Sequence, residues 1–173
     1  MRLKGPQAMA DKTITERLQP SLLDRLTDLE PEAKTEGRDS RVINIRRLRE
    51  IIRRDLAWLL NANNMETLID AEVYPHATRS VLNYGVREVS GDFSTKNRAD
   101  EIRKAILRAI TLFEPRIKEG TLAVTLRQVE KESRTIIEFD IHADMWAQPL
   151  PMELYLRSQI DLTTGQLTLD RVG

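Results

Sequence analysis

The sequence predicts an α+β fold, in which helices come first and an antiparallel sheet of three to four strands comes last. Apolar residues recur at intervals of three and four up to about residue 113, which is typical of amphipathic helices. After Gly120 the apolar period changes to two, which is typical of half-buried strands. With 173 residues, of which 40% are apolar and 31% charged, the chain has enough apolar side chains for one core.

Composition excludes several classes of protein. The chain has no cysteine, which excludes a disulfide framework, a thiolate metal site and a cysteine nucleophile, and fits a reducing compartment such as the cytoplasm. Lys+Arg and Asp+Glu are both 27, so nucleic-acid binding would have to rest on a local patch. No apolar run approaches the ~20 residues of a membrane span, and the N-terminus lacks the apolar core of a signal peptide. We therefore expect neither direct membrane insertion nor a cleaved leader.

Residues 1–40 are expected to form an N-terminal arm that carries one short amphipathic helix. Ser21 is placed to cap this helix, and Asp24 follows three residues later as in a capping box. The helix is expected to end near Glu30-Pro31, before a polar connector that runs to Arg41. Its apolar stripe consists of Leu22, Leu23, Leu26 and Leu29. Such a helix either docks into a groove of a partner protein or packs on its own domain.

Residues 41–173 are expected to form the main domain, which opens with a helix from about Asn44 to Asn61. Its inner face is apolar, with Ile45, Leu48, Ile51, Ile52, Leu56, Leu59 and Leu60. Its outer face carries Arg46, Arg47, Arg49, Arg53 and Arg54, and between Arg38 and Asp55 seven arginines stand against three acidic residues. This face either contacts carboxylates of a partner protein, with Arg46 and Arg53 as candidates, or grips phosphate, or is simply solvated.

Two further helices are expected before the sheet. Pro75 suits the first turn of a short helix from Ala77 to Tyr84, which Gly85 would close in a left-handed conformation. A turn at residues 90–93 follows. Thr95 or Asn97 can then start a long helix with the apolar stripe Ala99, Ile102, Ala105, Ile106, Ala109, Ile110 and Phe113.

Alternating apolar and polar residues predict the strands. Leu122, Val124 and Leu126 predict one half-buried strand, and Ile137, Phe139 and Ile141 predict a second, joined by a charged loop at residues 130–134. A third strand runs from Met152 to Leu162, and a turn at Thr164-Gly165 leads to a fourth at residues 166–169.

One local feature breaks a rule. In Phe113-Glu114-Pro115-Arg116-Ile117 a glutamate stands at a helix C-terminus, where the helix dipole disfavours a negative charge unless a cation answers it. Pro115 stiffens the backbone between Glu114 and Arg116, so the two charges are presented from a fixed corner. The corner is suited either to charged recognition of another chain or to an intramolecular ion pair that locks it.

The sequence contains no common catalytic motif. A P-loop, a dinucleotide-binding glycine fingerprint, a nucleophile elbow and HExxH are all missing, and His76 and His142 lie far apart in sequence. We assign no catalytic residue, metal or cofactor. A pair of carboxylates suitable for glycoside hydrolysis would arise by chance among 27 acidic residues.

The corner resembles the Glu-Pro-Arg motif of phage baseplate wedge proteins, a family historically labelled lysozyme-like, and within it the TssE subunits of type VI secretion baseplates. Pro20-Ser21-Leu22-Leu23-Asp24-Arg25-Leu26 is similar to the leucine-rich opening of TssE proteins, and residues 80–85 (SVLNYG) are similar to their central segment. The resemblance covers about Pro20 to the C-terminus.

The resemblance implies a non-enzymatic cytoplasmic subunit, recruited to the inner face of the envelope within a sixfold multi-protein assembly. Its partners would be other wedge subunits and the contractile sheath protein, whose polymerisation it would template from the strands after Leu122. The wedge would be contacted by Glu114, Pro115 and Arg116. A groove of a partner protein would receive the docking helix through Leu22, Leu23 and Leu26. The alternatives are a peptidoglycan-cleaving muramidase and an Arg-rich nucleic-acid-binding module.

Overall fold

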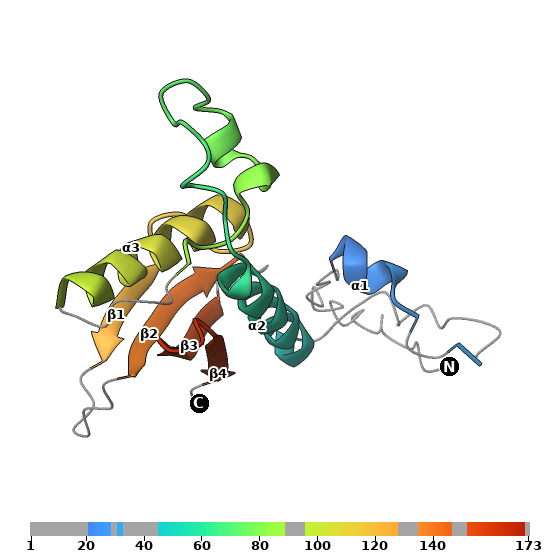
Figure 1. The fold of residues 1–173 in the computed structure, drawn as a ribbon. Coiled ribbons are helices and arrows are strands. Elements are labelled where there is room, and N and C mark those ends of the chain that lie inside the picture. The colour runs from blue at the N-terminus through green and yellow to red at the C-terminus, as the bar shows by residue number, and fades with distance from the viewer. Residues whose placement is uncertain are drawn as a thin grey trace, which may run out of the picture.

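The computed structural model describes residues 21–28, 31–32, 45–88, 96–127, 135–146 and 152–171. The helices are α1 (Leu22–Leu26), α2 (Ile45–Asn61) and α3 (Lys96–Phe113), with the short 3-10 helices η2 (Ala77–Arg79) and η3 (Val81–Asn83) between α2 and α3. The strands are β1 (Ala123–Arg127), β2 (Ile136–Met145), β3 (Met152–Asp161) and β4 (Leu167–Arg171). They form one antiparallel sheet in the order β1-β2-β3-β4 (Figure 1), which confirms the predicted α+β fold.

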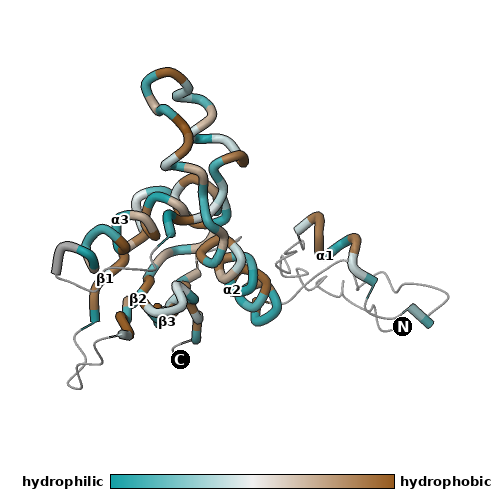
Figure 2. Tube along the Cα trace, in the orientation of Figure 1, coloured by the Kyte–Doolittle hydropathy of each residue, from teal (hydrophilic) through white to brown (hydrophobic). Residues whose placement is uncertain are grey.

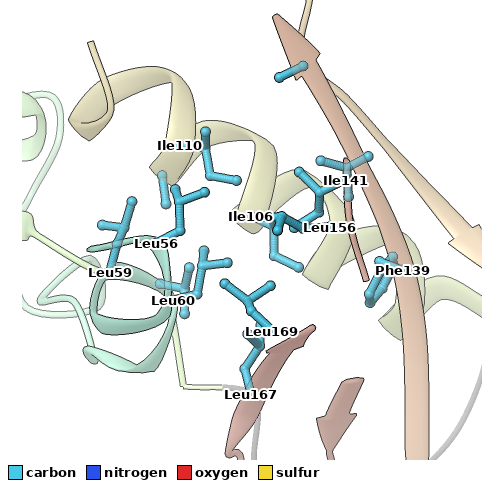
Figure 3. Close-up of a cluster of buried hydrophobic side chains, with 14 of the residues drawn as sticks. Leu56, Leu59, Leu60, Ile106, Ile110, Phe139, Ile141, Leu156, Leu167 and Leu169 are labelled. Carbon is cyan, nitrogen blue, oxygen red and sulfur yellow. The ribbon is translucent and has the colours of Figure 1, made fainter. Parts of the chain in front are cut away.

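The core lies between the sheet and the two long helices. The apolar stripes of α2 and α3 meet the inward-facing residues of the strands, as the close-up in Figure 3 shows. At the centre, the side chains of Leu56, Ile106, Ile110, Phe139, Ile141 and Leu156 are at most 1% exposed. The helical and strand periods read from the sequence therefore place the buried faces correctly.

Local details differ from the sequence-based expectation where side chains compete for main-chain hydrogen bonds. The helix expected from Ala77 to Tyr84 is instead two 3-10 turns, because Ser80 between them is extended. Its hydroxyl donates to Ala77 O and accepts from Leu82 N. Helix α1 ends at Leu26 and not near Glu30, because Thr27 is extended and its hydroxyl bonds Leu23 O at 2.8 Å.

Two single residues are also corrected. Asn97 lies inside α3, so it does not start that helix. Leu126 is exposed and not half-buried; it lies near the end of β1, the outermost strand of the sheet in the described part of the chain. Other expectations lie outside the described residues: the first twenty residues, most of the connector, the turn at 90–93, the cap at Thr95 and the loop at 130–134.

Residues 62–86, here called the lobe, project away from the helices and the sheet (Figure 1). The neck of the lobe is closed by a parallel bridge between Asn63 and Val86, in which Asn64 N donates to Val86 O and Val86 N donates to Ala62 O. Gly85 adopts φ +117°, and a Cβ placed on it would lie 2.1 Å from the carbonyl oxygen of Ala62. The neck therefore requires glycine at this position.

The two edges of the sheet differ. On β4, the side-chain amide of Asn61 donates to Leu167 O at 2.8 Å and accepts from Leu167 N at 2.9 Å, much as a neighbouring strand would. Arg53 Nη1 donates to Leu169 O at 3.2 Å. We call Asn61 and Arg53 the edge clamp. In the described part of the chain no helix side chain makes corresponding bonds to β1.

Removing the edge clamp should loosen β4. We expect Asn61→Ala to lower the free energy of unfolding by about 1–2 kcal/mol, because two main-chain groups of Leu167 lose their partner. Urea denaturation measures this change. Asn63→Ala, at an exposed neighbouring position, is the matched control and should shift the value by no more than about 0.5 kcal/mol. Equal effects of the two variants would argue against the clamp.

Candidate functional site

The candidate site is the corner between α3 and β1. Helix α3 ends at Phe113, as the following Glu114-Pro115 predicts. Beyond Pro115 the main chain pairs with the end of β2: Lys118 N donates to Asp144 O and Trp146 N donates to Arg116 O, both at 2.7 Å, around a bridge between Ile117 and Met145. Proline and these bonds together fix the backbone of the corner.

Glu114 and Arg116 form an intramolecular ion pair. Arg116 Nε donates to Glu114 Oε1 at 2.7 Å, and the main-chain N of Arg116 donates to the same oxygen at 3.1 Å. Glu114 is only 5% exposed, so its charge depends on this partner. Arg116 thereby supplies the cation that the helix end requires.

Asp55 on α2 is the third member of the site. Arg116 Nη2 donates to Asp55 Oδ2 at 2.7 Å. Although burial lowers the pKa of Arg116, the hydrogen bond and charge of Glu114, followed by those of Asp55, raise this pKa overall above its ordinary value. The guanidinium thus ties the corner to α2.

The network continues from α2 to α1. Arg54 Nε donates to Asp55 Oδ1 at 3.0 Å, and Arg54 Nη1 donates to Asp24 Oδ1 at 2.6 Å. The hydrogen bonds from Arg54 hold the pKa of Asp24 below its ordinary value, against a smaller opposing effect of burial. Arg54 also lies over the Trp58 ring, 4.8 Å from its centroid. We call Asp24, Arg54, Asp55, Arg116 and Glu114 the charge chain.

The charge chain holds α1 by its polar side. Asp24 is the anchor, and Ser21 caps the helix by accepting from Asp24 N while its hydroxyl donates to the Asp24 carboxylate. The leucines predicted to dock are exposed: Leu22 at 70%, Leu26 at 75%, and Leu23 to a smaller extent. The apolar stripe of α1 therefore remains available on the surface of the chain.

The arginines of α2 are largely used within the fold. Arg53 is part of the edge clamp, Arg49 Nη2 donates to Glu153 O at 3.2 Å, and Arg47 pairs with Glu50. Arg54 belongs to the charge chain. Arg46 is exposed, and within the described residues its side chain makes no hydrogen bond or ion pair. Carboxylates therefore balance the charge of Arg47 and Arg54, whereas Arg49 and Arg53 are held in place by neutral carbonyl oxygens.

Sequence reasoning found two members of the charge chain as a unit, Glu114 and Arg116, and missed the other three. Asp55 lies 61 positions before Arg116, and no local pattern links such distant residues. A signal was present: Asp55 directly follows two arginines on the most basic helix of the chain. An isolated acid within such a run indicates an ion-pair network more than a phosphate-binding face.

Tyr84 lies at the base of the lobe, and its pKa depends on two acidic members of the charge chain. Its ring packs edge-on against Phe113, with centroids 5.3 Å apart. Burial raises the pKa of Tyr84 above its ordinary value of 10.0, and the negative charges of Asp55 and Glu114 raise it further. The folded state thus favours the neutral phenol, and this contribution to stability is present below pH ~10 and lost as the pH rises through the Tyr84 pKa.

We expect Glu114→Gln to lower the pKa of Tyr84 towards 10, because one of the two nearby negative charges is removed. An NMR titration of ¹³C-labelled tyrosine follows the three tyrosines of the chain. Asp170→Asn, at an exposed position on β4, serves as the control and should leave the Tyr84 pKa unchanged. A Tyr84 pKa that is the same in the wild type and the Glu114→Gln variant would contradict this electrostatic account.

A comparison with protein families identifies the chain. The model of the family described as baseplate wedge protein gp25 matches residues 46–150 of the 173. The chain belongs to this family. The match takes in α2, the lobe, α3, the corner, β1 and β2. Comparison with curated proteins and with solved structures gave no match.

Membership of the gp25 family fixes the broad role of the chain. The family is structural and not enzymatic, and it contributes to the baseplates of contractile tail-like systems, so other baseplate subunits are partners of the chain. In the described residues, no group of three His, Cys, Asp or Glu side chains is placed to hold a metal ion. The helices described here are too short or too polar to span a bilayer.

Proposed function

We propose that this gp25-family chain is the TssE subunit of a type VI secretion baseplate, where it joins wedge subunits and templates the first ring of the contractile sheath. The observation that carries the proposal is the family match across α2 and the Glu-Pro-Arg corner. The leucine-rich opening at residues 20–26 and the segment at residues 80–85, which are similar to TssE sequences, support the type VI assignment over a phage tail. The chain acts in the bacterial cytoplasm, at the inner face of the envelope.

The wedge-binding surface in this proposal combines α1 with the corner. The charge chain supports this combination, because it holds α1, α2 and the corner together through consecutive ion pairs. Leu22, Leu23 and Leu26 supply apolar contact area, while the exposed Pro115 and the partly exposed Arg116 supply a rigid border that the buried Glu114 holds in place. Arg46 and Arg53, both exposed on α2, extend the charged border. Residues 1–40 then serve as the docking arm, and residues 41–173 as the wedge domain.

The sheath-facing surface in this proposal is the edge strand β1. Main-chain groups of β4 are occupied by the edge clamp, which makes it a poor acceptor of another strand. Strand β1 lacks such a clamp in the described part of the chain, and Leu126 is exposed on it. An unclamped edge can accept an extended segment of a sheath subunit through main-chain hydrogen bonds.

The wedge contact is tested with two variants that differ in mechanism. Leu22→Ser with Leu26→Ser removes apolar contact, and Glu114→Gln with Arg116→Gln removes the corner charges as a pair. We expect each double variant to reduce recovery of identified wedge subunits in a pull-down at least about tenfold. The leucine variant should keep the melting temperature of the wild type, because both side chains are exposed. Leu22→Met with Leu26→Met is the matched control and should bind normally.

The sheath role is tested in cells that carry a fluorescent sheath protein. Deleting the gene of this chain should abolish sheath assembly, and the wild-type gene should restore it. Leu126→Pro, which removes an outward-facing main-chain donor from the open edge of β1, should fail to restore sheaths although the variant still co-purifies with the wedge. Normal sheath assembly in the deletion strain would refute the proposed function.

A further inference from the structure

The lobe exposes many large apolar side chains. Half of the exposed large apolar side chains in the described part of the chain lie in this segment of 62–86: Met65, Leu68, Val73, Tyr74, Val81, Leu82 and Tyr84. Figure 2 shows hydrophobic stretches along the lobe, including its far end. Its most buried polar side chains are Thr78 and Asn83. The lobe thus buries two polar side chains while large apolar side chains are exposed among polar ones on its surface.

Hydrogen bonds give the lobe a fixed shape without an apolar core. Asn83 is 3% exposed, and its amide donates to Thr78 O at 3.0 Å and accepts from Met65 N at 3.0 Å, which ties together both arms of the lobe. Asp70 accepts from Glu72 N at 2.9 Å and orders the outer turn. The Gly85 contact and the main-chain bonds at the neck fix its base. Apolar side chains held outward on an ordered support are typical of a docking surface, not of a loose loop.

The charges of the lobe indicate what covers it. Residues 62–86 carry three acidic side chains, Glu66, Asp70 and Glu72, and one basic side chain, Arg79. Glu66 is paired with Arg108 of α3 at 2.7 Å, which leaves Asp70 and Glu72 against Arg79, a net charge of −1. Two copies of the lobe would therefore repel each other. An anionic membrane surface would also be disfavoured, since it attracts Lys and Arg.

We propose that the lobe inserts into an apolar groove, rimmed by Lys and Arg, on another subunit of the same baseplate. The inference rests on the proposed function, because the occupant is a baseplate subunit. The lobe projects from the domain, so the complementary surface is concave. Leu68, Val73 and Leu82 enter the groove, and Asp70 and Glu72 meet its basic rim. This contact is separate from α1 and the corner, and it gives the chain a second attachment point within the wedge.

The test measures binding of the full-length chain to a purified wedge complex that lacks it. The triple variant Leu68→Ser, Val73→Ser, Leu82→Ser should bind about thirtyfold more weakly, because three apolar contacts are lost. Leu68→Met, Val73→Ile, Leu82→Met is the matched control and should bind within about threefold of the wild type. An unchanged melting temperature and unchanged hydrogen exchange in the lobe verify that the serine variant is folded. A photo-crosslinker at position 73 should label residues of an apolar groove with a basic rim.

The outcomes separate this inference from the proposed function. Serine and wild-type chains that bind equally well, while Glu114→Gln with Arg116→Gln abolishes binding, would overturn the role of the lobe and support the corner. Failure of the wild-type chain to bind the wedge complex would overturn both. Lobe-dependent dimers in sedimentation velocity, or lobe-dependent binding to phosphatidylcholine–phosphatidylglycerol vesicles without binding to the wedge, would overturn the inference in favour of a second copy or a lipid surface.

Discussion

Replacing Arg116 by alanine should destabilise the isolated chain by about 3 kcal/mol, since the buried Glu114 carboxylate then loses the cation that balances it. The same substitution frees one oxygen of Asp55, which keeps its bonds to Arg54 and so adds little to the loss. Urea denaturation, with circular dichroism as the signal, measures the change. The result would show that the corner is part of the fold as well as a candidate interface.

The matched control for Arg116→Ala removes both charges. Glu114→Gln with Arg116→Gln leaves no uncompensated buried charge, so we expect a loss of only about 1 kcal/mol. This difference matters for the binding experiments, because a charge reversal at one position would confuse loss of contact with loss of fold. If Arg116→Ala costs no more than the double variant, the ion pair does not stabilise the corner.

Replacing Gly85 by alanine should have the second large effect, and a local one. The new Cβ would lie 2.1 Å from the Ala62 carbonyl oxygen, and φ +117° is unfavourable for any residue with a side chain. The neck must then open, which we expect to lower the stability of the lobe by at least about 2 kcal/mol. Hydrogen exchange should increase for amides bonded across the neck, such as those of Asn64 and Val86, while the central amides of α3 and β2 stay protected.

Gly120→Ala separates strain from steric overlap. Gly120 also has a positive φ, +79°, but a Cβ there would meet no heavy atom within 4 Å. We expect this variant to cost about 1 kcal/mol, from backbone strain alone. Should the two alanine variants have the same effect, the close approach of Gly85 to Ala62 would not be what requires glycine at the neck.

The elements of the fold could be predicted from the sequence because they depend on local periodicity. The stripe of α2 and the alternation in β2 follow from spacing alone, and Pro115 marks the end of α3. The short segment around Ser80 could not be predicted, because a single hydroxyl decides between one helix and two turns.

The site was predictable only in part, for a different reason. Glu114 and Arg116 are separated by one residue, so their pairing was among the interpretations that the sequence left open. Their link to Asp55 depends on how α2 packs against the corner, and the link from Arg54 to Asp24 depends on where the arm lies. Of the lobe, the sequence predicted only a short helix from Ala77 to Tyr84, and no pattern indicated that its large apolar side chains are exposed.

The unequal edges of the sheet give the molecule a polarity. Asn61 and Arg53 occupy carbonyl groups on β4 that a further strand would need, while β1 has no equivalent clamp in the described part. A sheet with two open edges can be copied into an endless row, as in fibrils. A sheet with one closed edge can bind a further strand on one side only. It can therefore stand at the start of a row of strands but not in the middle of the row. Under the proposed function, such a chain would act as the nucleus of a sheath that grows in a single direction.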